Sequence, residues 1–128
     1  TFSDRLIILL LHFSFLMRNK KNLYPIKLLQ ETHDNFFRSL ESDIRETGHG
    51  DVTVNKKMKD YLNKFYDILG KIQNWDNLNV NEKNCILNNI LDTNISNEDL
   101  IKYFDKFVIF LKNKTLNYFT KGVIELKF

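Results

Sequence analysis

The sequence predicts an all-α protein: a compact single-domain bundle of about five helices over residues 1–128, ending in a short extended tail. Apolar residues recur at spacings of three and four over most of the chain, which is the period of a helix buried on one face. With 43% hydrophobic residues in 128, the chain can bury one core. One proline and four glycines interrupt the pattern, at turns or helix ends.

The first helix is expected to begin after Ser3, whose hydroxyl can cap it, and to end in a basic cluster at residues 18–21. It contains the apolar run Leu6–Met17. A helix of that length rises about 18 Å, well short of the roughly 30 Å hydrocarbon core of a bilayer. We interpret the run as a buried central helix. The alternative is a helix that docks its surplus apolar face on a partner or on a bilayer surface.

The second and third helices each carry one apolar stripe. Pro25 suits the first turn of the second helix, because its missing N–H would lack a partner there. Thr53 is the expected cap of the third. The stripe of the second helix comprises Leu29, His33, Phe36, Phe37, Leu40 and Ile44, with His33 at its edge. The stripe of the third comprises Val54, Met58, Tyr61, Leu62, Phe65, Leu69 and Ile72.

Two shorter helices are expected to follow. Residues 74–79 break the period, and Asn79 with Glu82 three residues later has the form of a reciprocal cap for a fourth helix. Ser96 with Asp99 repeats this spacing and predicts the start of a fifth. The residues expected to face inward from the fifth helix are Leu100, Tyr103, Phe104, Phe107, Val108 and Leu111.

The end of the chain changes pattern after the fifth helix. Helical character is expected to reach Phe119, and Gly122 then ends it. Apolar residues alternate with others over residues 123–128, which predicts the extended tail.

The junction between the second and third helices is the most specific local feature. Residues 40–58 read as an acidic helix end, a Gly-x-Gly-Asp turn and the start of a basic helix. Gly48 and Gly50 are expected to adopt left-handed torsions, which cost residues with a Cβ roughly 1 kcal/mol or more. We expect Asp51 to accept backbone N–H bonds at the turn. The sequence therefore predicts a tight corner.

Charge is divided between the two helices that this corner joins. Residues 31–51 carry six acidic residues against two arginines, a balance of about −4. Residues 53–71 carry five lysines against two aspartates, a balance of about +3. Residues 102–121 form a second basic stretch. Such faces fit RNA or anionic lipid, and solvated helix flanks in a lysine-rich protein are the simpler interpretation.

The residue pattern indicates neither a catalytic nor a metal centre. His12, His33 and His49 are scattered and have no cysteine or carboxylate at a recognised metal spacing. The sequence contains no nucleophile elbow, P-loop or dinucleotide fingerprint. Its single cysteine, Cys85, cannot form an internal disulfide, and we interpret it as a small buried residue. We therefore expect no enzyme, no cofactor and no metal ion.

Two parts of the sequence carry a resemblance to a known family. The corner region contains Phe36-Phe37, Ile44-Arg45-Glu46-Thr47-Gly48-His49-Gly50-Asp51, the basic pair Lys56-Lys57, and Phe65-Tyr66. The first helix contains Phe2, Arg5, the leucine run and His12. These motifs, over residues 1–75, resemble the signature of the ubiquinol-cytochrome c chaperone family. The sequence departs from the family pattern at Asp67-Ile68, where the family has Gly-Arg, and at Ser14, where it has Trp.

The resemblance implies a non-enzymatic assembly factor that binds cytochrome b and promotes biogenesis of the ubiquinol-cytochrome c reductase complex, complex III. It also implies a second small assembly protein and the ribosome as partners, peripheral contact with the inner membrane, and no DNA. The expected location is the cytoplasmic side of that membrane in an alphaproteobacterium, or its matrix side in a mitochondrion. Because the chain starts at Thr1 rather than at a methionine, we expect an amino-terminal segment such as a targeting peptide to precede it.

The same resemblance points to the residues of the site. A client with long apolar helices must be shielded until it is inserted, so its chaperone needs an apolar groove beside polar anchors. The residues expected to bind partners are Arg45, Glu46, Lys56, Lys57, Arg5, His12 and Tyr66. Gly48, Gly50 and Asp51 are expected to build the turn, and Arg45 and Glu46 could instead bridge the helices. A helical adaptor, or a basic RNA- or ribosome-binding module unrelated to respiration, is the alternative function.

Overall fold

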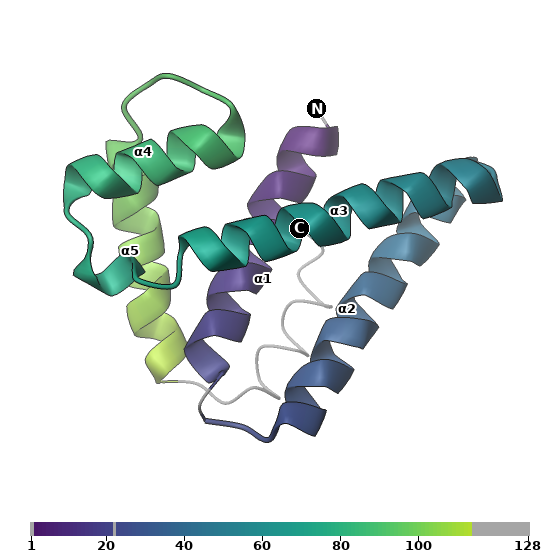
Figure 1. Cartoon of the computed structure of the whole chain (residues 1–128), viewed down its shortest axis with the longest axis horizontal. Coiled ribbons are helices and arrows are strands. Elements are labelled where there is room, and N and C mark those ends of the chain that lie inside the picture. Colours follow the sequence, from purple (N-terminus) through teal and green to yellow (C-terminus); the bar gives the residue numbers. More distant parts are fainter. Residues whose placement is uncertain (1, 22, 114–128) are drawn as a thin grey trace.

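The computed structural model describes residues 2–21 and 23–113, apart from the side chains of Phe2 and Ser3. Within these ranges the chain forms five α-helices, one 3₁₀-helix and no strand (Figure 1), which confirms the predicted all-α bundle. The elements are α1 (Phe2–Lys20), α2 (Ile26–Glu46), α3 (Asp51–Lys71), η1 (Trp75–Asn77), α4 (Val80–Leu91) and α5 (Glu98–Lys112). The predicted tail, residues 123–128, lies outside the described residues.

Helix α1 is the centre of the bundle and contacts α3, α4 and α5. Figure 1 shows α3 crossing in front of α1. The buried side chains of α1 are those of Leu6, Leu10, Leu11, His12, Phe13, Ser14, Phe15, Leu16 and Lys20. The interpretation of Leu6–Met17 as a buried central helix is confirmed. None of the helices in the described part of the chain has the length and apolarity that a membrane crossing requires.

Helices α2 and α3 form a hairpin whose arms diverge from the corner at residues 47–50 (Figure 1). Both predicted stripes are buried or half-buried, so both are confirmed. Aromatic rings fix α2 to α1 and the two arms to each other: the Phe13 and Phe36 rings stack with centroids 3.9 Å apart, and the Phe37 and Phe65 rings meet edge to face at 5.4 Å. The paired aromatics of the family signature thus form part of the core.

Helices α4 and α5 pack together on the other side of α1. The reciprocal cap of α4 is confirmed: the Asn79 side chain accepts from the Glu82 N–H at 2.8 Å, and the Glu82 carboxylate accepts from the Asn79 N–H at 3.2 Å. The indole of the buried Trp75 donates to Asp105 at 2.9 Å, and Lys83 pairs with the same carboxylate at 3.0 Å. This cluster ties η1, α4 and α5 together.

Three of the predicted helix starts are wrong. Ser3 lies inside α1, which already includes Phe2. Thr53 lies in the first turn of α3 rather than before it, because the extended Gly50 is the N-cap and Asp51 places its carboxylate at the positive end of the helix. The N-cap of α5 is Asn97 rather than Ser96.

The start of α5 is set by a contact with α4 that local sequence does not reveal. The backbone N–H of Asn97 donates to the side-chain oxygen of Asn84 at 2.8 Å, and the Asn97 side chain donates to Asn88 at 2.8 Å.

Pro25 lies one residue before the helix rather than in its first turn. It is the N-cap of α2 and directly precedes the first helical residue, Ile26.

Two predictions of burial are wrong for a geometric reason. The buried residues of α5 are Ile101, Phe104, Val108 and Leu111. Ile101 is therefore buried although the predicted inward face does not include it, and Tyr103, which that face includes, is 45% exposed. Successive residues of a helix turn by about 100°, and a small rotation of the stripe exchanges such neighbours. Cys85 is exposed, because α4 turns Leu87 and Ile90 toward the core. Helix α5 ends at Lys112, and Phe119 lies outside the described residues.

Candidate functional site

The corner between α2 and α3 consists of residues 47–50 only. Gly48 has a φ of +91°, where a Cβ is unfavourable, and its N–H donates to the Arg45 carbonyl at 3.0 Å. Gly50 has a φ of −76° and a ψ of 168°, which is ordinary extended backbone. The predicted left-handed torsion is therefore confirmed at Gly48 and wrong at Gly50, because leaving α2 requires a reversal whereas entering α3 requires an extended cap.

Arg45 bridges the two sides of the corner. Its guanidinium donates to Asp51 of α3, and to Glu41 of α2 at 3.0 Å. Hydrogen bonds to these carboxylates, Asp51 first and Glu41 second, raise the pKa of Arg45. Asp51 thus accepts from a side chain rather than from the turn backbone. Because all three groups meet water, these pairs orient the corner more than they stabilise the fold.

A groove of about 640 Å³ lies between α2 and α3. Its floor is apolar and contains Phe37, Met58 and Leu62. Its α2 rim contains Asp34, Arg38 and Glu41, and its α3 rim contains Asn55, Lys59 and Asn63. The α2 rim carries two acids and one arginine and the α3 rim one lysine, so the charge division along these helices continues into the groove as one net charge of each sign. An apolar floor between charged rims suits an amphipathic helix or an extended apolar segment.

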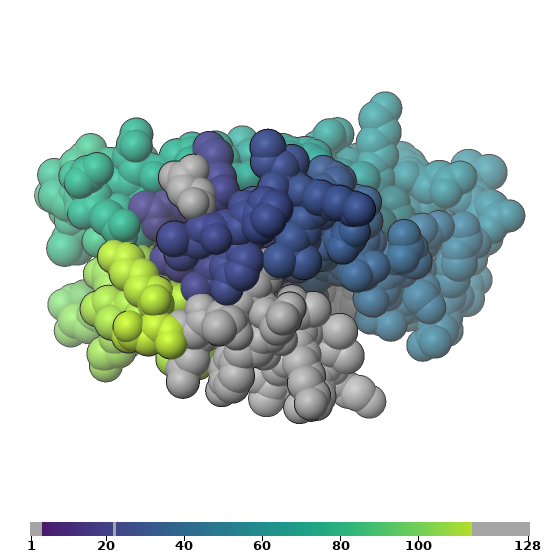
Figure 2. All heavy atoms as spheres, turned by 90° about the horizontal axis from the view of Figure 1, so that it is seen from below, coloured from purple at the N-terminus to yellow at the C-terminus, as the bar shows by residue number. Residues whose placement is uncertain are grey.

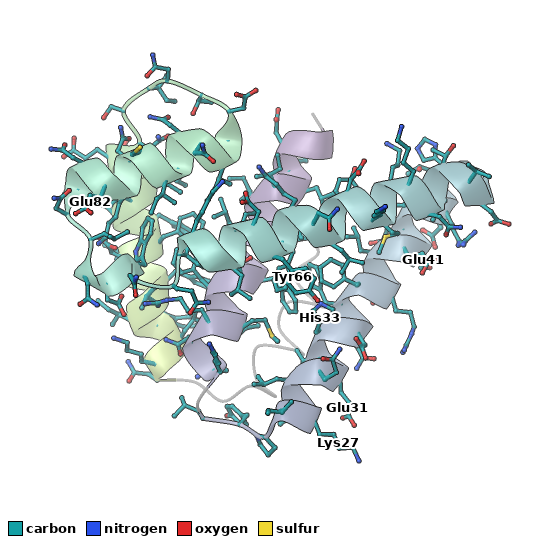
Figure 3. All side chains as sticks on the ribbon, viewed as in Figure 1. Lys27, Glu31, His33, Glu41, Tyr66 and Glu82 are labelled. Atoms are coloured by element: carbon teal, nitrogen blue, oxygen red, sulfur yellow. The ribbon has the colours of Figure 1, made fainter. Side chains whose placement is uncertain are left out.

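His33 of α2 and Tyr66 of α3 both line this groove, and their side chains meet at its wall (Figure 3). The Tyr66 hydroxyl lies 3.0 Å from His33 Nε2, and His33 Nδ1 lies 3.1 Å from the Asp34 carboxylate. The hydrogen bonds from His33 and, next, from Gln30 lower the pKa of the Asp34 carboxyl. More than half of the Tyr66 side chain is exposed, so a segment bound in the groove would contact it.

The structure brings together only part of the predicted partner-binding set. Arg45 lies at the corner and Tyr66 lines the groove. Lys56 and Lys57 lie in the first half of α3, Lys56 exposed and Lys57 half-buried. Glu46 is exposed at the end of α2. These residues all belong to the α2–α3 hairpin, whereas Arg5 is an exposed residue of α1.

His12 lies apart from this site, in the core between α1 and α5. Its Nε2 is 2.5 Å from the Tyr103 hydroxyl, and its Nδ1 is 2.7 Å from the Ile8 carbonyl. Burial lowers the pKa of His12, against the opposing effect of the Ile8 bond. The rings of Phe104 and Phe107 have their centroids 5.2 Å and 5.1 Å from it. His12 therefore joins helices, and a role in partner binding stays a prediction that its burial does not favour.

Comparison with known protein families bears on nearly the whole chain. A model of the family described as Ubiquinol-cytochrome C chaperone matches residues 1–114, which include every helix described above. The chain belongs to the ubiquinol-cytochrome c chaperone family. No curated protein and no solved structure matched it.

Membership of the ubiquinol-cytochrome c chaperone family gives the chain a chaperone role in the assembly of complex III, a process of the inner membrane. It also points to a non-enzymatic function. Among the described residues, no group of three or more histidine, cysteine or acidic side chains is placed to hold a metal ion. Because a chaperone acts by binding its client, its function is expected to reside in a binding surface.

Apart from Tyr66, the groove residues are absent from the partner-binding set that the sequence predicted. Asp34, Arg38 and Glu41 on α2 follow the spacing of three and four that places side chains on one helix face. Lys59, Leu62 and Tyr66 follow the same spacing on α3. Both rows run along an apolar stripe, and this spacing was the sequence signal that could have identified the groove residues. Only the hairpin shows that the two rows face each other.

Proposed function

We propose that this chain is a non-enzymatic assembly chaperone of complex III that binds an apolar segment of cytochrome b in the groove between α2 and α3. The apolar floor between two charged rims is the observation that carries the proposal. Phe37, Met58 and Leu62 would cover the client's apolar face, and the rims would hold its polar flank. Arg45, Lys56 and Lys57 belong to the same hairpin, nearer its corner, and stay partner-binding candidates from the sequence resemblance.

The groove lies within the helices that carry the family signature, which supports assigning the family's chaperone role to this surface. The proposal concerns cytochrome b, at the inner membrane. Binding of a second small assembly protein and of the ribosome stays a prediction from the sequence resemblance.

The test is capture of cytochrome b by the tagged full chain from a solubilised native membrane fraction, read with an antibody against cytochrome b. Tyr66→Ala, which removes part of the groove wall, and Lys56→Glu with Lys57→Glu are expected to reduce capture several-fold. The matched control is Lys102→Glu with Lys106→Glu, which changes net charge equally on α5. Circular dichroism should show unchanged helix content in every variant.

The salt dependence of binding distinguishes this proposal from the nucleic-acid alternative. Capture through an apolar groove should survive moderate salt, whereas binding of generic RNA by lysines falls steeply as salt rises. The groove assignment fails if Tyr66→Ala captures as much cytochrome b as the control. The binding role of Lys56 and Lys57 fails if their double variant captures as much as the control or unfolds the chain.

A further inference from the structure

Three polar groups form a hydrogen-bonded row at the wall of the client groove. The Asp34 carboxylate lies 3.1 Å from His33 Nδ1, and His33 Nε2 lies 3.0 Å from the Tyr66 hydroxyl. The His33 side chain is 14% exposed, whereas that of Asp34 is 49% exposed and more than half of Tyr66 is exposed. The imidazole is therefore screened between two groups that both meet the solvent.

Only one arrangement of hydrogens satisfies both bonds while the imidazole is neutral. Asp34 is ionised at neutral pH, because hydrogen bonds from His33 and, next, from Gln30 lower the pKa of its carboxyl. A carboxylate can only accept, so His33 Nδ1–H must donate to it. A neutral imidazole carries a single hydrogen, which leaves Nε2 as an acceptor. The hydroxyl hydrogen of Tyr66 is therefore committed to His33.

The polar positions that remain open at this wall are acceptors. With its hydrogen bound to His33, the Tyr66 oxygen can only accept a bond from a further partner. The Asp34 oxygen Oδ1 receives the bonds from His33 and from Gln30, the latter at 2.8 Å. Asp34 Oδ2 has no hydrogen bond to any residue in the part of the chain that the structure describes. Two open acceptors thus border the apolar floor.

We infer that the Asp34–His33 pair makes Tyr66 an acceptor, so that the groove selects an apolar client segment with a hydrogen-bond donor, such as a hydroxyl or an amide N–H, on its polar flank. A segment without a donor there would leave the Tyr66 oxygen unsatisfied once water is displaced. The inference rests on the proposed function, because it concerns the client of the same groove. Tyr66 contacts the client, and His33 is a positioning residue that acts through Tyr66.

The imidazole that sets this polarity is separate from the buried His12. Helix α5, in yellow-green, lies at the other end of the molecule from the corner of the α2–α3 hairpin (Figure 2), and His12 bonds to Tyr103 of α5. The other charged or titratable groups that line the groove with His33 are Asp34, Arg38, Glu41, Lys59 and Tyr66. Carboxylates, amines, guanidines and phenols ordinarily keep their charge between about pH 7.5 and pH 5.5, whereas an imidazole gains a proton.

Protonation of His33 reverses the bond to Tyr66. Both ring nitrogens of an imidazolium donate, so Nε2–H donates to the Tyr66 oxygen and the hydroxyl hydrogen turns away from the ring. Tyr66 then offers a donor where it offered an acceptor. The contribution of the Tyr66 hydroxyl to client binding should therefore shrink in mild acid, while the apolar floor stays the same.

The test is capture of cytochrome b by the tagged full chain, compared between the parent and Tyr66→Phe, which removes the hydroxyl and keeps the ring. At about pH 7.5 Tyr66→Phe should capture about two- to tenfold less, as expected for one hydrogen bond. At about pH 5.5 the two proteins should capture nearly equal amounts. Comparing them at each pH cancels the effects of acid on the client and on the rest of the fold.

Two further variants separate the hydroxyl from packing. Tyr61→Phe, at a half-buried tyrosine of α3 outside the groove lining, is the matched control and should capture as the parent does at both pH values. His33→Phe keeps a ring beside Phe37 and Phe65 but cannot accept from Tyr66. Adding Tyr66→Phe to His33→Phe should therefore change capture by the same factor at both pH values.

The inference is overturned if Tyr66→Phe captures as much as the parent at neutral pH, or if its deficit is the same in mild acid. It is also overturned if the pH dependence persists in the His33→Phe background. Should Tyr66→Phe capture normally while Tyr66→Ala does not, only this inference falls and the groove assignment stands. Normal capture by Tyr66→Ala as well would remove both.

Discussion

Two histidine–tyrosine pairs in this chaperone have similar chemistry in opposite settings. The buried His12 of α1 bonds to Tyr103 of α5, which is 45% exposed, with their polar atoms 2.5 Å apart. His33 and Tyr66 join α2 to α3 at the wall of an open groove, with their polar atoms 3.0 Å apart. The first histidine is 8% exposed and contacts phenylalanine rings of α5, whereas the second is half-buried and contacts a carboxylate as well as the Phe37 and Phe65 rings.

The difference shows how burial assigns a role to a side chain. A buried hydrogen bond must be kept, because each partner that loses it is left unsatisfied away from water. A bond at a groove wall can be exchanged for a bond to water or to a bound segment. The α1–α5 junction is therefore expected to support the fold, and the α2–α3 junction to remain available for a client.

Removing the two imidazoles gives the largest expected contrast. His12→Ala should lower the free energy of unfolding by about 2–3 kcal/mol, from a lost buried hydrogen bond and the cavity left among aromatic rings. His33→Ala should lower it by less, about 1 kcal/mol, because water can replace its hydrogen bonds while its contacts with the Phe37 and Phe65 rings are lost. Urea unfolding followed by circular dichroism measures both values. Equal losses in the two variants would contradict the contrast.

Gly48 and Gly50 allow the corner itself to be tested, with a smaller expected effect. A Cβ at either glycine would meet no atom within 4 Å, so only backbone conformation distinguishes them. Gly48→Ala should lower the unfolding free energy by about 1–2 kcal/mol because of its positive φ. Gly50→Ala should change it by at most about 1 kcal/mol, the usual preference for glycine over alanine at an N-cap. Urea unfolding measures both variants. A larger loss of unfolding free energy in Gly50→Ala than in Gly48→Ala would contradict the assignment of the chain reversal to Gly48.

The smallest expected effect is the pH dependence of the unfolding free energy that the titration of His12 produces. Burial lowers the pKa of His12 in the folded protein below the ordinary value of 6.5, so the unfolded chain binds this proton more readily. His12 therefore contributes its full share of the unfolding free energy above pH 6.5, and this share is lost as the pH falls below that value. The slope cannot exceed about 1.4 kcal/mol per pH unit for one group.

His12→Phe should remove this part of the pH dependence, and His33→Phe should leave it in place. Thermal or urea unfolding of both variants between about pH 7 and pH 5, around the ordinary histidine pKa, makes the comparison. If the slope persists in His12→Phe, another titrating group is responsible.

The helices themselves could be predicted with good success because their signals are local. The stripes of α2 and α3, the reciprocal cap of α4 and the reversal at Gly48 each depend on residues within a few positions of one another. The start of α5 could not be predicted, because Asn97 is held by Asn84 and Asn88 of another helix. The exposure of Cys85 and Tyr103 likewise depends on how α4 and α5 are rotated against α1.

The sequence by itself determined the helical class, the corner and the family signature, since periodicity, glycine torsion and motif are properties of neighbouring residues. Tertiary packing decided which of two similar histidines lies in the core, and that Asp34, Arg38 and Glu41 face Lys59 across one groove. It also joined the end of α1 to the end of α5, 91 positions apart at Lys20 and Leu111. Such contacts arise only when distant helices bury their apolar faces together, because burial is shared among elements and is not encoded in any one of them.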